Sequence, residues 1–155
     1  MRIASFITGL LTFAGIAACV AQAAAQMPQP TGGDARQLVA LPEPMRTHTI
    51  ANMRDHLLAL LEIDEALAKG DFAAASRIAE RRIGMSSLES HGAAHIATFL
   101  PPPMQEIGNR MHRAASRFAV EVQNAGATND VRPALLAKSV MLRECVACHA
   151  AYRYH

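Results

Sequence analysis

The chain has 155 residues, of which 51% are hydrophobic, and a formal net charge of +2 at neutral pH. Fifteen Lys and Arg residues nearly balance thirteen Asp and Glu residues, and no basic run stands out, which excludes the charge pattern typical of nucleic-acid-binding proteins. The chain has no tryptophan and only 5% aromatic residues, and it is rich in Ala and Leu. This composition favours helices over sheets, and the length fits one domain.

A secretory signal peptide is predicted at residues 1–25. A short positive start is followed by an apolar stretch over residues 3–20 and by small residues that offer A-x-A cleavage sites, with cleavage expected after Ala25. An alternative is a lipoprotein signal that ends at Ala18, because the residues before Cys19 resemble a lipobox. Cys19 would then be lipidated and anchor the protein to a membrane.

Residues 26–43 are polar and contain Pro and Gly, which predicts a mobile lead-in. Apolar residues at helical spacing then predict a first helix from about Pro44 to Ala68. Lys69-Gly70-Asp71 should end it, because Gly suits the C′ position and Asp can cap the next helix. A second helix is expected from about Phe72 to Ile83, followed by a looser stretch over residues 84–100.

A third helix is expected to open at Pro101-Pro102-Pro103, because proline is tolerated in a first turn. Its apolar stripe continues to Val122, and a turn is predicted over residues 124–130. Asn129 or Asp130 should cap a fourth helix that passes through Pro133 and runs to about Tyr152. Four amphipathic helices in about 110 residues predict an all-α fold, an antiparallel four-helix bundle over residues 44–155.

The most specific pattern lies on the last predicted helix, Cys145-Val146-Ala147-Cys148-His149. It is the C-x-x-C-H signature of covalent c-type haem attachment. On a helix these two cysteines and the histidine project from one face. The cysteines can form thioethers with the haem vinyl groups, and His149 can bind the iron as its proximal ligand. Because Cys19 would leave with the signal, one haem accounts for both remaining thiols.

Other chemistries for Cys145 and Cys148 fit the sequence less well. A thioredoxin-type dithiol or disulfide would follow a strand of a βαβ unit, and no such pattern precedes them. A zinc site would need a second pair of ligands, and His149 and His155 follow too closely to leave a finger loop. The export signal supports haem attachment, which takes place outside the bacterial cytoplasm. The predicted location is therefore the periplasm.

The segment from Cys145 to Arg153 resembles the C-x-x-C-H-x-x-[FY]-R ending of the class II c-type cytochromes, cytochrome c′ and its low-spin, methionine-ligated relatives. The resemblance implies a helical bundle with one covalent haem c on Cys145 and Cys148, and iron bound by His149. It also implies that Arg153 lies near the proximal ligand and the haem edge, where its charge would raise the reduction potential. The alternative for Arg153 is an exposed position at the chain end.

In this family the sixth iron ligand comes from the first helix, and Met53 stands where the low-spin members carry their methionine. Ligation by Met53 would give a six-coordinate electron carrier. The alternatives are that Met53 is only a core residue, or that His48 or His56 competes for the iron. An open sixth position would instead suit NO or CO. Thr49-Ile50 stand in place of the Arg-Gln pair of many cytochromes c′, which disfavours that gas-binding form.

A second metal is an alternative use of the histidines. His91 and His95 are four residues apart and could chelate a metal on one helical face, with Met104, Met111 and His112 near in sequence. They could equally bond the backbone or haem propionates. A bundle that binds copper through Met and His, with the cysteines as thiolates, is the hypothesis from outside haem chemistry.

The expected partners are redox proteins, and no enzymatic turnover is predicted, since an electron carrier needs none. Arg110, Arg113 and Arg117 line one stripe of the third helix. The stripe is either a solvated face or a docking patch for an acidic partner. Members of the family that the chain resembles often dimerise through their first two helices, so a homodimer is a further expectation.

Overall fold

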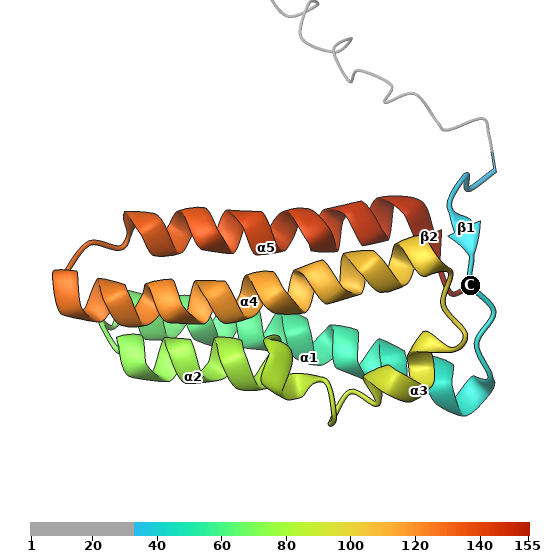
Figure 1. Cartoon of the computed structure of the whole chain (residues 1–155), viewed down its shortest axis with the longest axis horizontal. Helices are drawn as coiled ribbons and strands as arrows, with labels where there is room; N and C mark the ends of the chain where they lie inside the picture. Colours follow the sequence, from blue (N-terminus) through green and yellow to red (C-terminus); the bar gives the residue numbers. More distant parts are fainter. Residues whose placement is uncertain (1–32) are drawn as a thin grey trace, which may run out of the picture. The chain divides into compact units, whose positions relative to one another are not determined.

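Residues 33–155 are described by the computed structural model, and the predicted signal peptide, Cys19 and the first part of the lead-in lie outside them. The described part is mostly helical, which confirms the all-α prediction. Its helices are α1 (Glu43–Ala68), α2 (Phe72–Arg82), α3 (Ala93–Ala97), α4 (Pro102–Thr128) and α5 (Arg132–Ala151), with a 3₁₀ turn, η1 (Met85–Ser87), before α3 (Figure 1). None of these helices is long and apolar enough to cross a membrane.

The turn between α1 and α2 forms as the sequence predicts. Gly70 has a φ of +74°, a left-handed conformation that glycine adopts without a steric cost. The Asp71 carboxylate accepts a hydrogen bond from the Ala74 N–H at 2.9 Å and so caps the first turn of α2. The chain therefore reverses direction within three residues, and α2 packs back along α1.

The predicted turn over residues 124–130 is wrong, because α4 continues to Thr128. Gly126 lies in the helix interior, where a Cβ atom would stand 3.1 Å from the Cβ of Phe72. A glycine here thus lets α4 approach the start of α2 closely, and this contact offsets its poor helix propensity. Asn129, with a φ of 56°, ends the helix in the left-handed conformation.

Successive helices pack against one another: α1 on α2, α2 on α4, and α4 on α5. Figure 1 shows that they run in alternating directions. The backbones of α1 and α5 make little close contact with each other. Small alanines let the other pairs approach closely around a few large side chains. The core cluster includes Ala59, Ile63, Ala75, Ala79, Ile83, Ala115, Phe118, Val122 and Met141.

Part of the predicted mobile lead-in is ordered. Strand β1 (Gln37–Leu38) pairs in parallel with β2 (Tyr152–Arg153), directly after α5. The next residue, Val39, is 4% exposed, and its N–H donates to the Arg153 carbonyl at 2.8 Å. The lead-in therefore holds the chain end that follows the C-x-x-C-H motif, an interaction that composition could not reveal.

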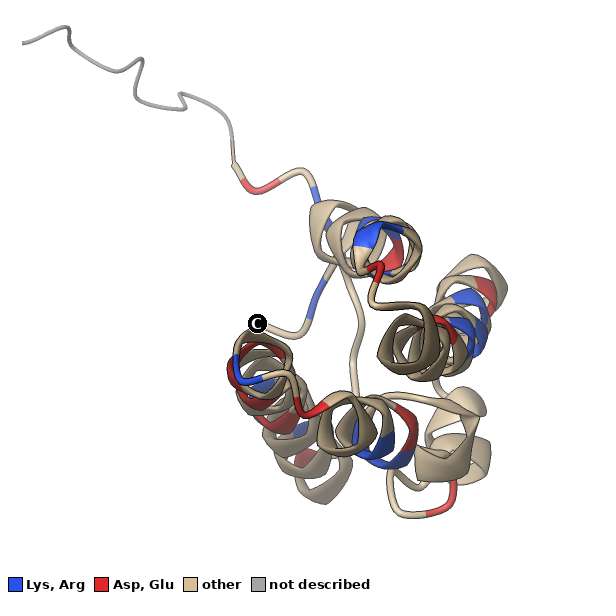
Figure 2. Ribbon diagram, turned by 90° about the vertical axis from the view of Figure 1, so that its left-hand side faces the viewer, with Lys and Arg blue, Asp and Glu red and all other residues tan. Residues whose placement is uncertain are grey.

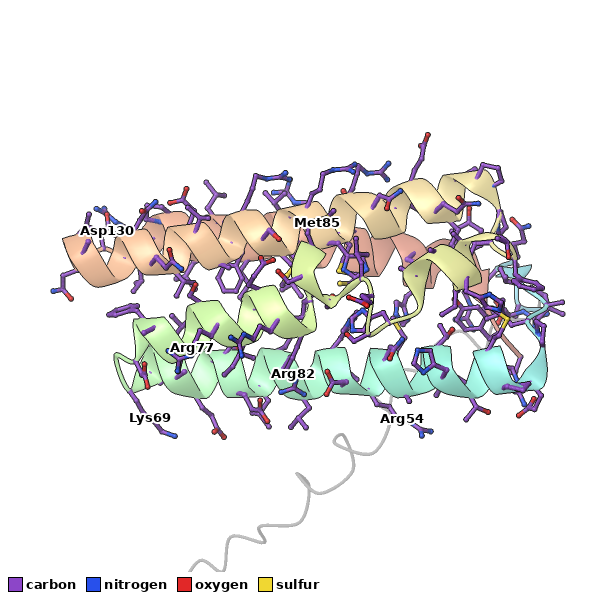
Figure 3. All side chains as sticks on the ribbon, turned by 60° about the horizontal axis from the view of Figure 1, so that its bottom comes forward. Arg54, Lys69, Arg77, Arg82, Met85 and Asp130 are labelled. Atoms are coloured by element: carbon purple, nitrogen blue, oxygen red, sulfur yellow. The ribbon has the colours of Figure 1, made fainter. Side chains whose placement is uncertain are left out.

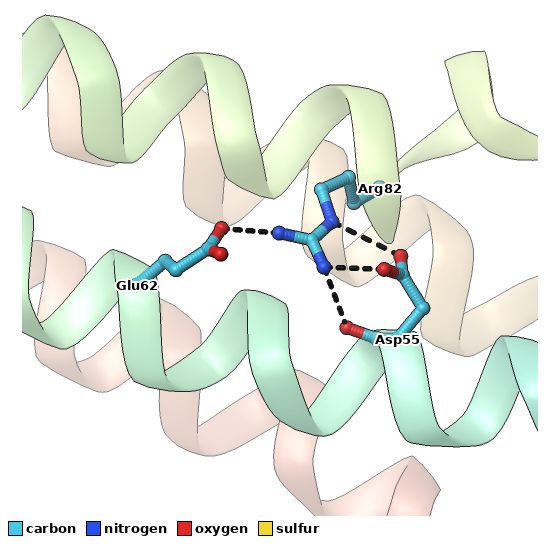
Figure 4. Close-up of polar contacts among 3 residues, drawn as sticks. All are labelled: Asp55, Glu62 and Arg82. Carbon is cyan, nitrogen blue, oxygen red and sulfur yellow. Dashed lines mark hydrogen bonds and ion pairs between the residues drawn. The ribbon is translucent and has the colours of Figure 1, made fainter.

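An ion cluster joins α1 to the end of α2. Arg82 lies between Asp55 and Glu62 of α1 and forms ion pairs with both (Figure 4). Its Nε donates to the Asp55 carboxylate at 3.0 Å, and its Nη2 donates to the Asp55 carbonyl at 3.2 Å. Hydrogen bonding from Arg82 lowers the pKa of Asp55. The guanidinium thus fixes α2 against the middle of α1.

Replacing Arg82 with glutamine is expected to lower the free energy of unfolding by about 1–2 kcal/mol, because two partly buried carboxylates lose their common cation. Urea denaturation followed by circular dichroism measures the change. The matched control is Arg77→Gln, since Arg77 lies on the exposed side of the same helix (Figure 3) and forms no ion pair within the described residues. Equal losses in the two variants would contradict the prediction.

Candidate functional site

The C-x-x-C-H motif lies in the last two turns of α5. Cys145 and Cys148 are half-buried free thiols, and His149 is exposed. The Cys145 thiol is 3.8 Å from the Met141 carbonyl, a weak contact within the helix. All three motif residues lie on the helix itself, as the sequence predicts, so their spacing places them on one side of α5.

The two thiols do not have the properties of a reactive redox pair. Burial raises the pKa of the Cys145 thiol, and burial followed by the charge of Cys145 raises that of Cys148. Reactive dithiols have lowered pKa values and often sit at a helix N-terminus, whereas these lie near a C-terminus, where the helix dipole disfavours a thiolate. The environment of the two thiols therefore does not favour a reactive dithiol.

An ion pair between Lys138 and Asp64 fixes the register between α5 and α1. Met53 precedes Asp64 by eleven residues, and His149 follows Lys138 by eleven. The helices run in opposite directions (Figure 1), so both positions lie about 16 Å from the ion pair toward the same end. Eleven residues are close to three full turns of a helix. The Met53 side chain therefore points in nearly the same direction as that of Asp64, and the His149 side chain in nearly the same direction as that of Lys138. By this register we expect Met53 across from His149.

The side of α1 that faces α5 is apolar and uncovered. Leu57 is one turn after Met53 and is 69% exposed, and Leu61 is 55% exposed. By the same register Leu57 stands across from Cys145. Arg54, in contrast, extends from the outer side of α1 (Figure 3). A large apolar group held on the cysteines would bury these leucines.

Each alternative sixth ligand is directed elsewhere. The His48 Nε2 atom lies 3.1 Å from the His91 carbonyl, in the segment between η1 and α3. His56 is 8% exposed, and its ring lies beside the rings of His91 and His112, with centroids 4.9 and 6.2 Å away. Met53 is half-buried. Of the three candidates, Met53 is the one that the Asp64–Lys138 register places opposite the motif.

The last helix ends close to its predicted end, and an extended segment follows it. Helix α5 ends at Ala151, one residue before Tyr152, which has an extended conformation, so Arg153 lies in β2. Arg153 is half-buried, which is not the exposed position considered as its alternative. Nothing in the sequence indicated that Tyr154 would lie beside the motif. Burial, with a smaller contribution from the Cys148 charge, raises its pKa to about 12. Its hydroxyl therefore stays protonated beside the motif.

His91 and His95 do not share one helical face. Gly92, with a φ of +63°, interrupts the backbone between them, and α3 begins only at Ala93. The structure instead brings His91 to His56 and His112. Across residues 33–155, no three His, Cys, Asp or Glu side chains are already arranged to hold a metal ion. The predicted chelating pair is therefore not formed.

The arginine stripe of α4 is partly neutralised. Arg110 pairs with Glu144 of α5 at 3.1 Å and with Glu106 of α4 at 3.8 Å. Figure 2 shows acidic and basic residues side by side on the helices of the described chain. One of the three arginines of the stripe is therefore paired within the bundle, and docking of an acidic partner stays a prediction.

Comparison with known proteins found no matching family model, no matching curated protein and no matching solved structure.

Proposed function

We propose that the chain is a periplasmic monohaem c-type cytochrome that carries single electrons. In this proposal α1, α2, α4 and α5 form an antiparallel four-helix bundle, and the haem lies between α1 and α5. The observation that supports the proposal is the Asp64–Lys138 ion pair, because its register puts Met53 at the level of His149, with Cys145 and Cys148 beside them. A half-buried thioether and an imidazole are the two axial ligands of many electron-transferring haems.

The residues present fit a covalent haem. Cys145 and Cys148 are free, on one side of α5, and would supply the two thioether sulfurs. Leu57 and Leu61 expose the apolar surface that such a group would cover. The Thr49 hydroxyl oxygen, one turn before Met53, is buried with no hydrogen-bond partner within the described residues, and it could serve a haem carboxylate. A bound haem would supply an iron that alternates between the ferric and ferrous states.

The protein residues would set the properties of that site. His149 would bind the proximal side, and Met53 would close the distal side to small ligands. Arg153 would place a positive charge near the site, and the β1–β2 pairing would hold its backbone in position. No residue is assigned a catalytic role, because electron transfer needs only a positioned group and a controlled potential.

The test is the mass of the exported protein after purification from a host with haem-attachment machinery. We expect the mature chain to carry one covalently added haem, and the Cys145→Ser/Cys148→Ser variant to lack it. Circular dichroism of the variant reports whether the helices still form. A correctly processed wild-type chain with no added haem mass would overturn the proposal, and would leave a metal-binding bundle as the remaining hypothesis.

A further inference from the structure

Three histidines from distant parts of the chain meet beside α1. His56 comes from α1, His91 from the segment between η1 and α3, and His112 from α4. Their ring centroids are 4.9 Å (His56–His91), 5.7 Å (His91–His112) and 6.2 Å (His56–His112) apart. In a tetrahedral site with metal–nitrogen bonds of about 2.1 Å, imidazole centroids lie roughly 5 Å apart. The observed triangle is only slightly larger.

The hydrogen bonds of the cluster assign the tautomers of two rings. The His112 Nδ1–H donates to the Ile83 carbonyl at 2.6 Å. The buried Ser87 hydroxyl donates to the Gly84 carbonyl at 2.7 Å, so its oxygen accepts from His91 Nδ1–H at 3.3 Å. Each ring is therefore held through Nδ1, which leaves an unprotonated Nε2. Metal-binding histidines are oriented in this way by backbone and hydroxyl acceptors.

His56 provides an independent observation. It is 92% buried, being 8% exposed, and its Nε2 atom has no hydrogen-bond partner within the described residues. A buried polar atom without a partner carries a free-energy cost of about 1–3 kcal/mol, and such an atom requires an explanation. The two nearest rings described around it are those of His91 and His112. A shared ligand would pair all three nitrogens.

We propose that His56, His91 and His112 bind one divalent transition-metal ion of the zinc or copper type through their Nε2 atoms. Because the three side chains do not already enclose a metal position, the rings must turn and the widest pair must close by about 1 Å. Neutral imidazoles suit zinc and copper better than the hard ions magnesium and calcium. The site uses neither the motif cysteines nor Met53, so it does not depend on the proposed haem.

The cluster is also ready to bind at neutral pH. Burial lowers the pKa of all three imidazoles, so they are uncharged there and need not release a proton to a metal. The segment that carries His91 is short and turn-rich, and η1 and α3 are its regular elements. A metal bond would therefore tie this segment to α1 and α4.

Zinc titration of the mature, haem-loaded protein tests the proposal. After treatment with a chelator, isothermal titration with Zn²⁺ should give one bound ion per chain. His91→Gln and His112→Gln should each weaken binding about 100-fold or more, because one of three ligands is removed. His95→Gln is the matched control, since His95 is an exposed histidine four residues from His91 and outside the cluster. It should bind Zn²⁺ as the wild type does.

Two further readouts keep the result interpretable. Zn²⁺ should raise the unfolding temperature of the wild type and of His95→Gln, and leave that of His91→Gln unchanged. The haem mass of every sample is measured in parallel, so a failure of haem attachment is distinguished from a failure of zinc binding. No stoichiometric binding, or binding that survives both cluster substitutions, would overturn the proposal.

Discussion

Replacing Met53 with leucine is expected to abolish the far-red sulfur-to-iron charge-transfer band of the oxidised protein and to let the reduced protein bind CO. Leucine conserves most of the volume of methionine but has no sulfur, so packing is kept while the proposed ligand is removed. The loss of the band should be complete, and CO binding should change from none to one per haem. Absorption spectra of the oxidised, reduced and CO-treated protein measure both changes.

The control is Met85→Leu, the same substitution at a methionine of η1, outside the proposed haem site, which should keep the band. A band that persists in Met53→Leu would show that Met53 is only a packing residue. A wild-type protein that is high-spin and already binds CO or NO would favour the gas-binding alternative. A low-spin spectrum without the band would point to a histidine, and His56→Gln would then be examined next.

Local sequence signals predicted the parts of the fold that depend on a few neighbouring residues. The Gly70 turn and the Asp71 cap formed as expected, because their conformations are set by the residues themselves. The C-x-x-C-H motif is likewise fixed by spacing on one helix. The end of α4 was missed, because Gly126 normally signals a turn and here serves close packing against Phe72. Local propensity cannot foresee such a contact.

Contacts between segments that are far apart in the sequence could not be predicted from local patterns. The pairing of Leu38 with Arg153 joins two segments more than a hundred residues apart, and neither has a strong strand pattern. The His56, His91 and His112 cluster draws on three separate segments, so no spacing rule could find it. The i, i+4 spacing of His91 and His95 was misleading, because Gly92 breaks the helix between them. The Asp64–Lys138 pair sets the α1–α5 register, and only the structure supplied it.

Acidification from pH 7 to pH 5 is expected to lower the free energy of unfolding by about 2 kcal/mol through His56 alone. Burial, aided by the nearby His91 and His112, lowers the pKa of His56 from 6.5 to about 4. Below pH 6.5 the unfolded chain takes up a proton at this site, and the folded chain does not until about pH 4. Stability is therefore lost as pH falls through this window, by about 3 kcal/mol in total.

His91 and His112 act in the same direction, because burial also lowers their pKa values. Asp55 has a pKa below its usual 3.8, so its contribution to stability is lost only at lower pH. The change in unfolding free energy between pH 7 and pH 5 therefore comes from the histidines. Urea denaturation of the full mature chain, with a chelator present, measures the slope. His56→Gln should remove about 2 kcal/mol of the change between pH 7 and pH 5, whereas His95→Gln should retain it. A slope unchanged in His56→Gln would contradict the prediction, because it would mean that the pKa of His56 is the same in the folded and the unfolded chain.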